Sequence, residues 1–435
     1  MTTVAEIRMW GRTIGAVYMA EGNQTAAFEY DPAFARSGIE ISPLMMPLER
    51  KVFTFPELSR QTFYGLPGLL ADSLPDRFGN ALINAWLASQ GRHPDSFNAV
   101  ERLCYTGVRG MGALEYKPAT GPKSRQADRI QVDKLVSLAS EILNHRDSLN
   151  VSFNGENKEN ALKEILRIGT SAGGARAKAV IAWNPLTNEV RSGQLPAEKG
   201  FEHWLLKFDG VSGNKDKEAE DPTGYGLIEY AYSKMAADAG ITMSECRLFR
   251  ENNRNHFMTR RFDRLPGNKK LHMQSLGALA HYDFNMAGAY SYEQAMLVIR
   301  QLGLPMSSIE EMFRRMVFNI IARNQDDHVK NIAFLMDKSG NWALAPAFDL
   351  IYSFNPYGNW TSSHQMTLNG KRDNFTMEDF KACARTASMK RGRWKTIIKE
   401  VHEKVAHWSD YAHEAGVNAI WRDRIQKTLR LDTFA

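Results

Sequence analysis

The segment at residues 324–331, Asn-Gln-Asp-Asp-His-Val-Lys-Asn, contains the residues of this chain whose types and spacing best fit catalysis. Asp326 precedes Asn331 by five residues, which is the spacing in the catalytic loop of kinase-type phosphoryl-transfer enzymes. In such loops the aspartate accepts the proton of the attacking hydroxyl, and the asparagine binds Mg²⁺. A solvated polar turn after a helix would contain the same residue types, so the loop alone leaves both interpretations open.

The other polar residues of this loop extend the candidate set. His328 stands two residues after Asp326, where many protein kinases have a lysine that contacts the γ-phosphate. We place His328 and Lys330 with Asp326 in the predicted catalytic set, although the spacing gives Lys330 no specific task. Asp327 is left out, because only Asp326 keeps the five-residue spacing to Asn331.

A second carboxylate, Asp349, follows in the sequence Leu-Ala-Pro-Ala-Phe-Asp-Leu at residues 344–350. Before it, the chain predicts a strand over residues 332–336 and a Ser-Gly-Asn turn. A hairpin of this kind would return Asp349 to a Mg²⁺ ion held by Asn331, as kinases require. The local sequence is not Asp-Phe-Gly, so this metal-ligand prediction depends on order and context.

The loop must be positioned by the helix that is expected over residues 311–323. Its apolar residues recur at positions that form one broad face: Met312, Phe313, Met316, Val317, Ile320 and Ile321. This face indicates core packing rather than contact with a cofactor. A buried helix would hold the loop rigidly, and positioning together with electrostatics supplies most of phosphoryl-transfer catalysis.

A glycine-rich segment at residues 169–177 could bind phosphates through its backbone N–H groups. The predicted phosphate-contacting residues are Ser171, Ala172, Gly173, Gly174 and Ala175. Lys207, on a strand expected over residues 203–208, would bind the α- and β-phosphates. Glu229, on a helix expected over residues 226–239, would pair with this lysine, unless it is an exposed glutamate near a helix start.

The same glycine-rich segment also fits a different enzyme class. Residues 169–173, Gly-Thr-Ser-Ala-Gly, match the G-x-S-x-G nucleophile elbow of α/β-hydrolases, with Ser171 as the nucleophile. The elbow requires a strand before the serine and a helix after it. Here a helix is expected before it and a strand over residues 178–183 after it, so a serine hydrolase is the less favoured alternative. The segment is not a G-x-x-x-x-G-K-[ST] loop, which disfavours a P-loop NTPase.

The order of the expected elements predicts an α+β protein with a two-lobed, protein-kinase-like fold. Residues 1–118 would form an N-terminal accessory domain of mixed α and β structure. Residues 119–264 would form the kinase N-lobe with the glycine-rich loop and hinge. Residues 265–435 would form an all-helical C-terminal lobe that contains the catalytic loop.

Composition sets broad limits on the class of protein. A chain of 435 residues with 43% hydrophobic residues can bury a large core in two or three domains. The formal charge of +6 suits a phosphate-bearing partner but is weak evidence by itself. Three widely separated cysteines indicate neither a disulfide framework nor a zinc site. The N-terminal residues lack a signal-peptide core and no run of about 18 apolar residues occurs, so we expect a cytoplasmic protein.

Taken in this order, the motifs resemble those of the HipA family, the serine/threonine kinase toxins of bacterial HipB–HipA toxin–antitoxin pairs. The resemblance covers nearly the whole chain. The matching motifs lie at residues 69–79 and 112–118 in the first part, and at 171–179, 204–207, 261–264, 326–331 and 346–349 in the kinase part.

The resemblance implies an ATP- and Mg²⁺-dependent protein kinase. Asp326 would be the catalytic base, Asn331 and Asp349 would bind Mg²⁺, and Lys207 would bind ATP phosphates. Residues 258–262 would form the hinge beside adenine. The hinge residues in the predicted nucleotide site are Arg260, Arg261 and Phe262, and Arg260 stands where the family usually has glutamate.

The resemblance also implies regulation and partners. Ser171 matches the serine that family members autophosphorylate, and a dianion there would repel ATP phosphates and disrupt the phosphate loop. A HipB-like helix-turn-helix antitoxin would restrain the toxin and link it to operator DNA. The substrate would be a translation component such as an aminoacyl-tRNA synthetase. The alternative is a catalytically weak kinase-fold co-repressor, against which the intact set Asp326, Asn331, Asp349 and Lys207 argues.

Overall fold

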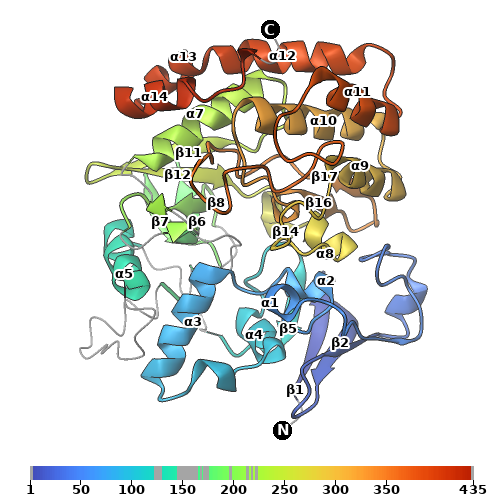
Figure 1. Cartoon of the computed structure of the whole chain (residues 1–435). Helices are drawn as coiled ribbons and strands as arrows, with labels where there is room; N and C mark the ends of the chain where they lie inside the picture. The colour runs from blue at the N-terminus through green and yellow to red at the C-terminus, as the bar shows by residue number, and fades with distance from the viewer. Residues whose placement is uncertain are drawn as a thin grey trace. The chain divides into compact units, whose positions relative to one another are not determined.

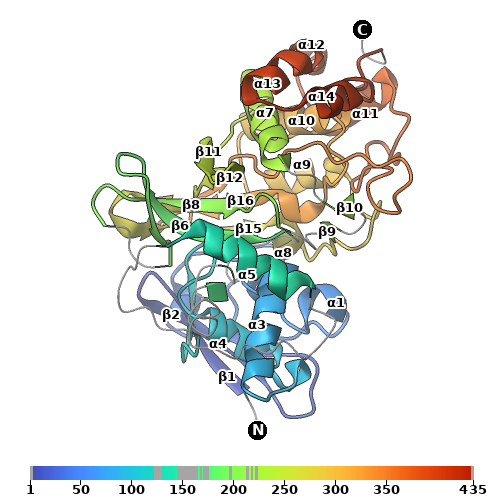
Figure 2. The ribbon, with the colours of Figure 1, turned by 90° about the vertical axis from the view of Figure 1, so that its left-hand side faces the viewer.

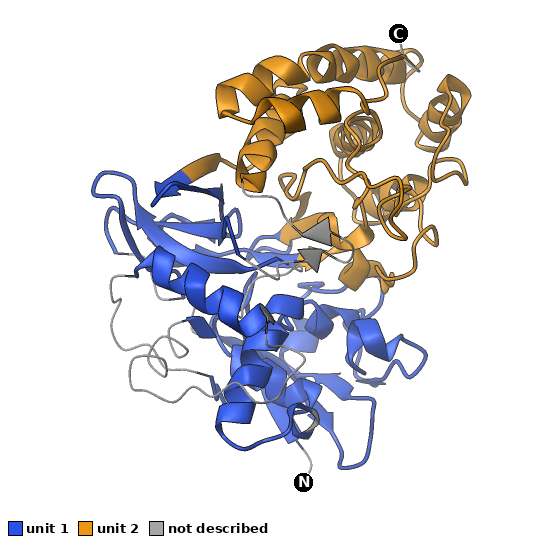
Figure 3. Cartoon of the chain, turned by 60° about the vertical axis from the view of Figure 1, so that its left-hand side comes forward, with its two compact units in different colours: residues 1–223, 249–273, 336–340 blue, residues 224–248, 274–335, 341–435 orange. Residues whose placement is uncertain are grey.

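The structure is a computed structural model that describes residues 3–121, 130–144, 165–166, 169, 176–194, 198–211, 215–216, 219–220 and 224–432. The chain divides into two compact units (Figure 3). Unit 1 contains residues 1–223, 249–273 and 336–340, and unit 2 contains residues 224–248, 274–335 and 341–435.

Unit 1 begins with an antiparallel sheet whose strands have the order β4-β3-β2-β1-β5 (Figure 1). The strands are β1 (Thr3–Met9), β2 (Arg12–Met19), β3 (Ala27–Tyr30), β4 (Val52–Phe53) and β5 (Leu114–Lys117). Along β1 the alternate residues Ala5, Ile7 and Met9 are buried, as one-sided packing of a sheet requires. With the helices described next, this sheet gives the first part of the chain the mixed α and β structure that the sequence predicts.

Helices accompany this sheet in unit 1: α1 (Arg60–Phe63), α2 (Gly68–Ala71), α3 (Arg77–Ser89), α4 (Ala99–Thr106) and α5 (Val132–Asn144). Asp76 caps α3, because its carboxylate accepts a hydrogen bond from the backbone N–H of Gly79 at 2.7 Å. Asn98 and Glu101 form a reciprocal capping box at the start of α4. Local side-chain chemistry therefore fixes where both helices begin.

A second sheet, with the order β11-β12-β8-β6-β7, lies mostly in unit 1. Its strands are β6 (Lys178–Asn184), β7 (Glu189–Ser192), β8 (Glu202–Lys207), β11 (Cys246–Glu251) and β12 (Arg254–Arg260). Two short strand pairs accompany it, β9 (Lys215–Asp216) with β10 (Ala219–Glu220) and β13 (Arg264–Leu265) with β14 (Lys269–Lys270). The strands expected over residues 178–183 and 203–208 are thus confirmed.

One hydrophobic core joins α3 and α5 to this second sheet, and Figure 2 shows these elements. Its buried members include Phe78, Leu82, Leu135, Ala139, Ile181 and Trp204. The predicted boundary between residues 118 and 119 therefore falls inside unit 1, and the three predicted domain ranges stay a prediction.

Unit 2 is mainly helical. Its helices are α7 (Tyr225–Asp238), α8 (Leu276–Ala280), α9 (Tyr292–Gln301), α10 (Met306–Ile321), α11 (Met377–Thr386), α12 (Arg393–Ala406), α13 (Trp408–Ala415) and α14 (Ala419–Gln426). A small sheet, β15-β16-β17, lies mostly in this unit and contains β15 (His272–Ser275), β16 (Ala333–Met336) and β17 (Trp342–Leu344). Residues 265–435, predicted as an all-helical lobe, thus also contain β14 and this small sheet. The sheet includes the hairpin expected before Asp349.

In the part of the chain that the structure describes, no helix has both the length and the apolar character that are needed to cross a membrane.

Asp263 is the centre of a buried charge cluster in unit 1. Its side chain is 0% exposed and lies 2.7 Å from Arg261 Nη2 and 2.6 Å from Arg264 Nη1. The backbone N–H of Gly112 also donates to Asp263, at 2.7 Å. Burial alone raises the pKa of Asp263, but the two guanidinium groups and these hydrogen bonds lower it overall, so the carboxylate is ionised.

Gly112 is the residue type that this cluster requires. Its φ is +74°, and an added Cβ would lie 2.9 Å from the backbone nitrogen of Met273. Its carbonyl accepts a hydrogen bond from Arg264 at 2.9 Å. The cluster thereby ties the segment before β5 to the segment after β12.

Replacing Asp263 by asparagine is expected to lower the free energy of unfolding by about 3–5 kcal/mol, because two buried guanidinium groups lose the carboxylate that they both contact. Urea unfolding of wild type and Asp263→Asn measures the loss. Glu198→Gln is the matched control, since Glu198 is 60% exposed in its pair with Arg191 and such pairs contribute at most about 1 kcal/mol. Equal effects of the two substitutions would contradict the role of the cluster.

Two buried histidines of unit 1 predict a pH dependence of stability. Burial lowers the pKa of His256 and of His272 to about 4, whereas an unfolded chain has a histidine pKa of about 6.5. Between these values the unfolded state binds protons that the folded state does not, so stability is lost as the pH falls below about 6.5. At pH 5.5 the loss is on the order of 1 kcal/mol for each histidine.

Urea unfolding at pH 7.5 and 5.5 tests this expectation. His272→Gln should reduce the difference between the two pH values, and His413→Gln, which changes an exposed histidine, should not. The interpretation fails if His272→Gln leaves the pH dependence of the wild type unchanged.

Candidate functional site

Helix α10 positions the predicted catalytic loop. The apolar face expected from the sequence is confirmed, because all six of its predicted residues are 0% exposed. The helix ends in a Schellman motif: Arg323 has φ +58°, and the N–H of Asn324 donates to the carbonyl of Asn319 at 2.9 Å. The loop thus starts from a fixed direction at the end of a buried helix.

Asp326 is held at both its side chain and its backbone. Its Oδ1 accepts a hydrogen bond from the indole Nε1 of Trp360 at 2.6 Å. Its backbone carbonyl accepts a hydrogen bond from Asn331 Nδ2 at 3.0 Å. The side chain remains 23% exposed, so the predicted base is accessible.

His328 and Lys330 lie beside the same aromatic ring. The His328 and Phe284 ring centroids are 5.5 Å apart, and Lys330 Nζ lies 5.2 Å from the Phe284 centroid. His328 Nε2 is 3.9 Å from Asp326 Oδ1, which is too long for a hydrogen bond. Their predicted catalytic roles stay predictions.

Asp327, which the predicted catalytic set leaves out, is bound by three donors. Its carboxylate accepts hydrogen bonds from Tyr292 Oη at 2.6 Å, from His364 Nδ1 at 2.8 Å and from the backbone N–H of Gln365 at 2.7 Å. Asn319 Nδ2 in turn donates to Tyr292 Oη at 3.0 Å. The loop is therefore anchored to α9, to α10 and to the segment that follows Asp349.

The charge states of Asp327 and His364 follow from their hydrogen-bond partners. Burial by itself raises the pKa of Asp327, but the hydrogen bonds from His364, Tyr292 and the N–H of Gln365 lower it overall, so the group is an ionised carboxylate. Arg430 Nη1 lies 2.8 Å from His364 Nε2, and because arginine only donates, that nitrogen must accept. His364 is therefore neutral with its proton on Nδ1, in agreement with the lowering of its pKa, chiefly by burial.

Asp349 is positioned by the strand segment that precedes it. Arg315 of α10 donates to the carbonyl of Ala345 at 2.8 Å, and the N–H of Ala347 donates to the carbonyl of Thr242 at 2.8 Å. Asp349 itself has φ +58°, a conformation that non-glycine residues adopt uncommonly and that is concentrated at functional sites. The carboxylate thus follows a backbone that is fixed on two sides.

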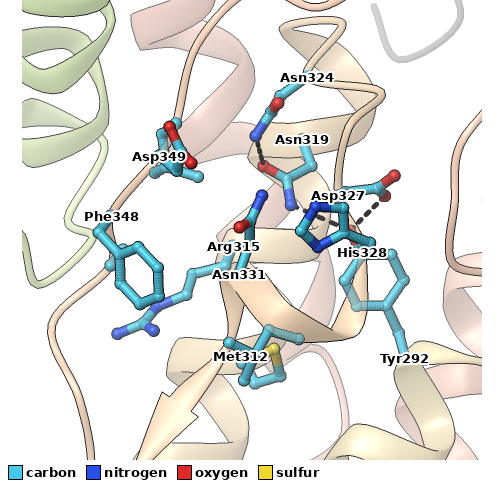
Figure 4. A pocket seen from close by; sticks show the side chains of 13 residues that line it. Tyr292, Met312, Arg315, Asn319, Asn324, Asp327, His328, Asn331, Phe348 and Asp349 are labelled. Atoms are coloured by element: carbon cyan, nitrogen blue, oxygen red, sulfur yellow. Dashed lines mark hydrogen bonds between the residues drawn. The ribbon is translucent and has the colours of Figure 1, made fainter. Parts of the chain in front are cut away.

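A small cavity in unit 2 brings two predicted metal ligands together (Figure 4). Its volume, counted as the space open to the centre of a water molecule, is about 20 Å³, which is enough for a water molecule or a small ion. It is lined by Tyr292, Met312, Arg315, Asn319, Asn324, Asp327, His328, Asn331, Ile332, Ala347, Phe348, Asp349 and Leu350. Asn331 and Asp349, from separate segments, thus face the same space.

The oxygen atoms that line this cavity are of the type that binds Mg²⁺. Asn331 uses its Nδ2 to bind the Asp326 carbonyl, which leaves its Oδ1 for a cation. Asn324 uses its Nδ2 to bind Asn319 Oδ1 at 2.9 Å, and its own Oδ1 is buried without a hydrogen-bond partner among the described residues. With Asp349 these groups are oxygen ligands, which Mg²⁺ prefers while it keeps several waters.

The predicted nucleotide-binding residues are only partly described. Residues 171–175, with Ser171, lie outside the described residues. Lys207 ends β8, and its Nζ lies 5.9 Å from the Phe257 ring centroid. Glu229 is 2% exposed, so it is not the exposed glutamate of the alternative interpretation. Lys207 and Glu229 belong to different units, and their pairing stays a prediction.

The predicted hinge residues differ in their surroundings. Arg260 is the last residue of β12 and forms an ion pair with Glu202 at 3.0 Å. The Arg261 guanidinium is 1% exposed and is bound to Asp263, so only its backbone remains for contact with a nucleotide. Phe262 follows directly in the chain. The contacts of all three with adenine stay predictions.

Several residues of this site were not predicted: Tyr292, Asn319, Asn324, Trp360, His364 and Arg430. Asn319 had a visible signal, since it is a polar residue within the apolar run of α10. Asn324 is the first residue of the loop, but its residue type gave it no specific task. The remaining four gave no signal, because the residues that they bind are distant in the sequence.

Comparison with known proteins gives the family. The model of the HipA-like C-terminal domain matches residues 170–409, and the model of the HipA N-terminal domain matches residues 5–117. A kinase-named protein of Haemophilus influenzae is 32% identical over 109 residues, which is 23% of this chain and 32% of that protein. This match therefore spans about a third of the relative's length.

Solved structures show the fold. The structure of HipA in the Shewanella oneidensis MR-1 complex of HipA, HipB and operator DNA has a TM-score of 0.68 and 16% sequence identity, and covers 99% of this chain and 96% of that one. The Helicobacter pylori proinflammatory kinase CtkA, with a TM-score of 0.35, is too dissimilar to support an argument. The predicted fold class is confirmed, and the chain belongs to the HipA family.

Proposed function

We propose that this protein is an ATP- and Mg²⁺-dependent serine/threonine protein kinase. The observation that carries the proposal is that Asn331 and Asp349 line one small cavity beside the loop that bears Asp326. Membership of the HipA family supports the same function. The combination of a base and two metal ligands is what phosphoryl transfer to a hydroxyl requires.

In this proposal Asp326 accepts the proton of the attacking hydroxyl through its exposed carboxylate. Asn331 and Asp349 hold Mg²⁺, which, when bound, neutralises charge that develops on the phosphoryl oxygens. The hydrogen bond from Asn331 to the Asp326 carbonyl links the metal ligand to the base, so the two groups keep one geometry. Positioning of this kind supplies most of the rate enhancement in phosphoryl transfer.

The nucleotide-binding part of the proposal comes from the sequence motifs. Lys207 and residues 171–175 bind the ATP phosphates, Glu229 orients Lys207, and the backbone of residues 260–262 contacts adenine. Autophosphorylation of Ser171 silences the enzyme, since a phosphate there repels the phosphates of ATP.

The proposed biological role is that of a HipA-like toxin in the cytoplasm. It arrests growth by phosphorylating a translation component such as an aminoacyl-tRNA synthetase, and a HipB-like antitoxin restrains it and links it to operator DNA. The support is the fold shared with a HipA that was solved together with HipB and operator DNA.

Replacing Asp326 by asparagine is expected to lower phosphoryl transfer about 100-fold or more, because the proton acceptor is removed. Transfer of label from radiolabelled ATP to lysate proteins and to Ser171 measures the change, and Ser171→Ala identifies the label on Ser171. Asp410→Asn, which changes an aspartate that is 73% exposed in α13, is the control. If wild type labels neither Ser171 nor any other protein, the kinase proposal is wrong and the co-repressor alternative gains.

Replacing Asp349 by asparagine is expected to raise the Mg²⁺ concentration that gives half-maximal activity about tenfold or more, because a carboxylate ligand is replaced by a neutral amide. Binding of Mn²⁺ in the presence of ATP, followed by electron paramagnetic resonance, measures the same effect without turnover. An unchanged Mg²⁺ requirement and unchanged Mn²⁺ binding would exclude Asp349 as a metal ligand.

A further inference from the structure

A tryptophan from a distant segment binds the predicted base. Trp360 Nε1 donates to Asp326 Oδ1 at 2.6 Å, and the two residues are separated by 34 positions in the sequence. The distance is short for an N–H···O hydrogen bond, as is typical when the acceptor is charged. The sequence motifs assign no function to Trp360.

The segment that carries Trp360 is docked on the loop on both sides of Asp326. Gln365 Nε2 donates to the carbonyl of Gln325 at 3.1 Å, and the N–H of Gln365 donates to Asp327 Oδ1 at 2.7 Å. Gln365 Nε2 also donates to the carbonyl of Trp360 at 2.6 Å. The residues before and after Asp326 thus bind one glutamine, and this glutamine binds Trp360. The indole is placed by these contacts rather than by a free loop.

The hydrogen bond between Trp360 and Asp326 limits the orientations that the carboxylate can adopt. The terminal torsion of an aspartate is broad, so a partly exposed carboxylate rotates unless something holds it. An indole N–H only donates, and it occupies Oδ1 without competing for the proton. The hydrogen bond to Oδ1 therefore restricts the rotation of the whole carboxylate.

We propose that Trp360 is a positioning residue that fixes the rotation of the Asp326 carboxylate toward the substrate hydroxyl. This inference rests on the proposed function, because it requires Asp326 to act as a base. Trp360 binds Oδ1 throughout the reaction, while Asn331 fixes the backbone of Asp326 from the other end of the loop. The proton of the hydroxyl goes to the Asp326 carboxylate as the new bond from oxygen to phosphorus forms and the bond from the γ-phosphorus to ADP breaks.

Three variants test the proposal. Trp360→Phe keeps an aromatic ring but removes the donor, so kcat is expected to fall about 10- to 100-fold with an unchanged KM for ATP. Trp360→His supplies a ring N–H and is expected to recover part of the loss. Tyr357→Ala changes a side chain of the same segment that is 95% exposed, and wild-type kcat is expected. Melting temperatures establish that the variants are folded.

A second measurement examines the contact without turnover. The indole N–H resonance that disappears in Trp360→Phe is one of nine in the amide spectrum, since the chain has nine tryptophans. Asp326→Asn weakens the acceptor and is expected to move this resonance. If the resonance does not move, the contact is absent in solution and the proposal is overturned.

The kinetic outcomes distinguish the two levels of the argument. An active wild type with full kcat in Trp360→Phe overturns the positioning role and leaves the kinase proposal intact. A higher kcat in Trp360→Phe also overturns it, since the indole would then obstruct the base. A wild type that transfers no phosphate to any protein overturns the kinase proposal and the positioning role with it. A loss in Trp360→Phe with partial recovery in Trp360→His supports both.

Discussion

The buried carboxylate of Asp327 is the constraint on which the candidate site depends. Its side chain is 1% exposed, and burial by itself would favour the neutral acid. Tyr292, His364 and the N–H of Gln365 supply enough hydrogen bonds to keep it ionised. A charge that is desolvated at this depth is stable only with all its donors present, so it fixes their positions as much as they fix its own. Because Asp327 belongs to the loop at residues 324–331, these contacts also hold the loop in place.

Asp327 also determines how Arg430, which follows α14, is bound. Because His364 donates to Asp327, its other nitrogen is left to accept from Arg430. Arg430 also donates to the carbonyl of Ile320 at 3.0 Å, within the last turn of α10. Helix α10, which precedes the loop, and Arg430, which follows α14, are thus linked to Asp327 through the neutral side chain of His364. Protonation of that histidine would turn its acceptor into a second donor facing a guanidinium.

Sequence reasoning was accurate where structure is local. The buried face of α10 and the hairpin of β16 and β17 follow from periodicity and turn residues, which act over a few positions. The five-residue spacing of Asp326 and Asn331 is also local, and their contact at 3.0 Å agrees with it. Trp360, His364 and Arg430 were missed, because each meets its partner across 34 to 66 positions. Such contacts arise only when the tertiary fold brings the segments together.

The two neighbouring aspartates lie in different surroundings, and the spacing predicts a role for only one of them. The proposed base must exchange a proton with a substrate, so it needs access, and the side chain of Asp326 is 23% exposed. An anchor must keep its hydrogen-bond donors without competition from water, and Asp327 is 1% exposed. Adjacent carboxylates in one loop would repel each other and raise each other's pKa if they shared one environment. Here the two carboxylates have separate environments and separate donors: Trp360 binds Asp326, and His364 binds Asp327. The loop can therefore contain a proposed base next to a buried anchor.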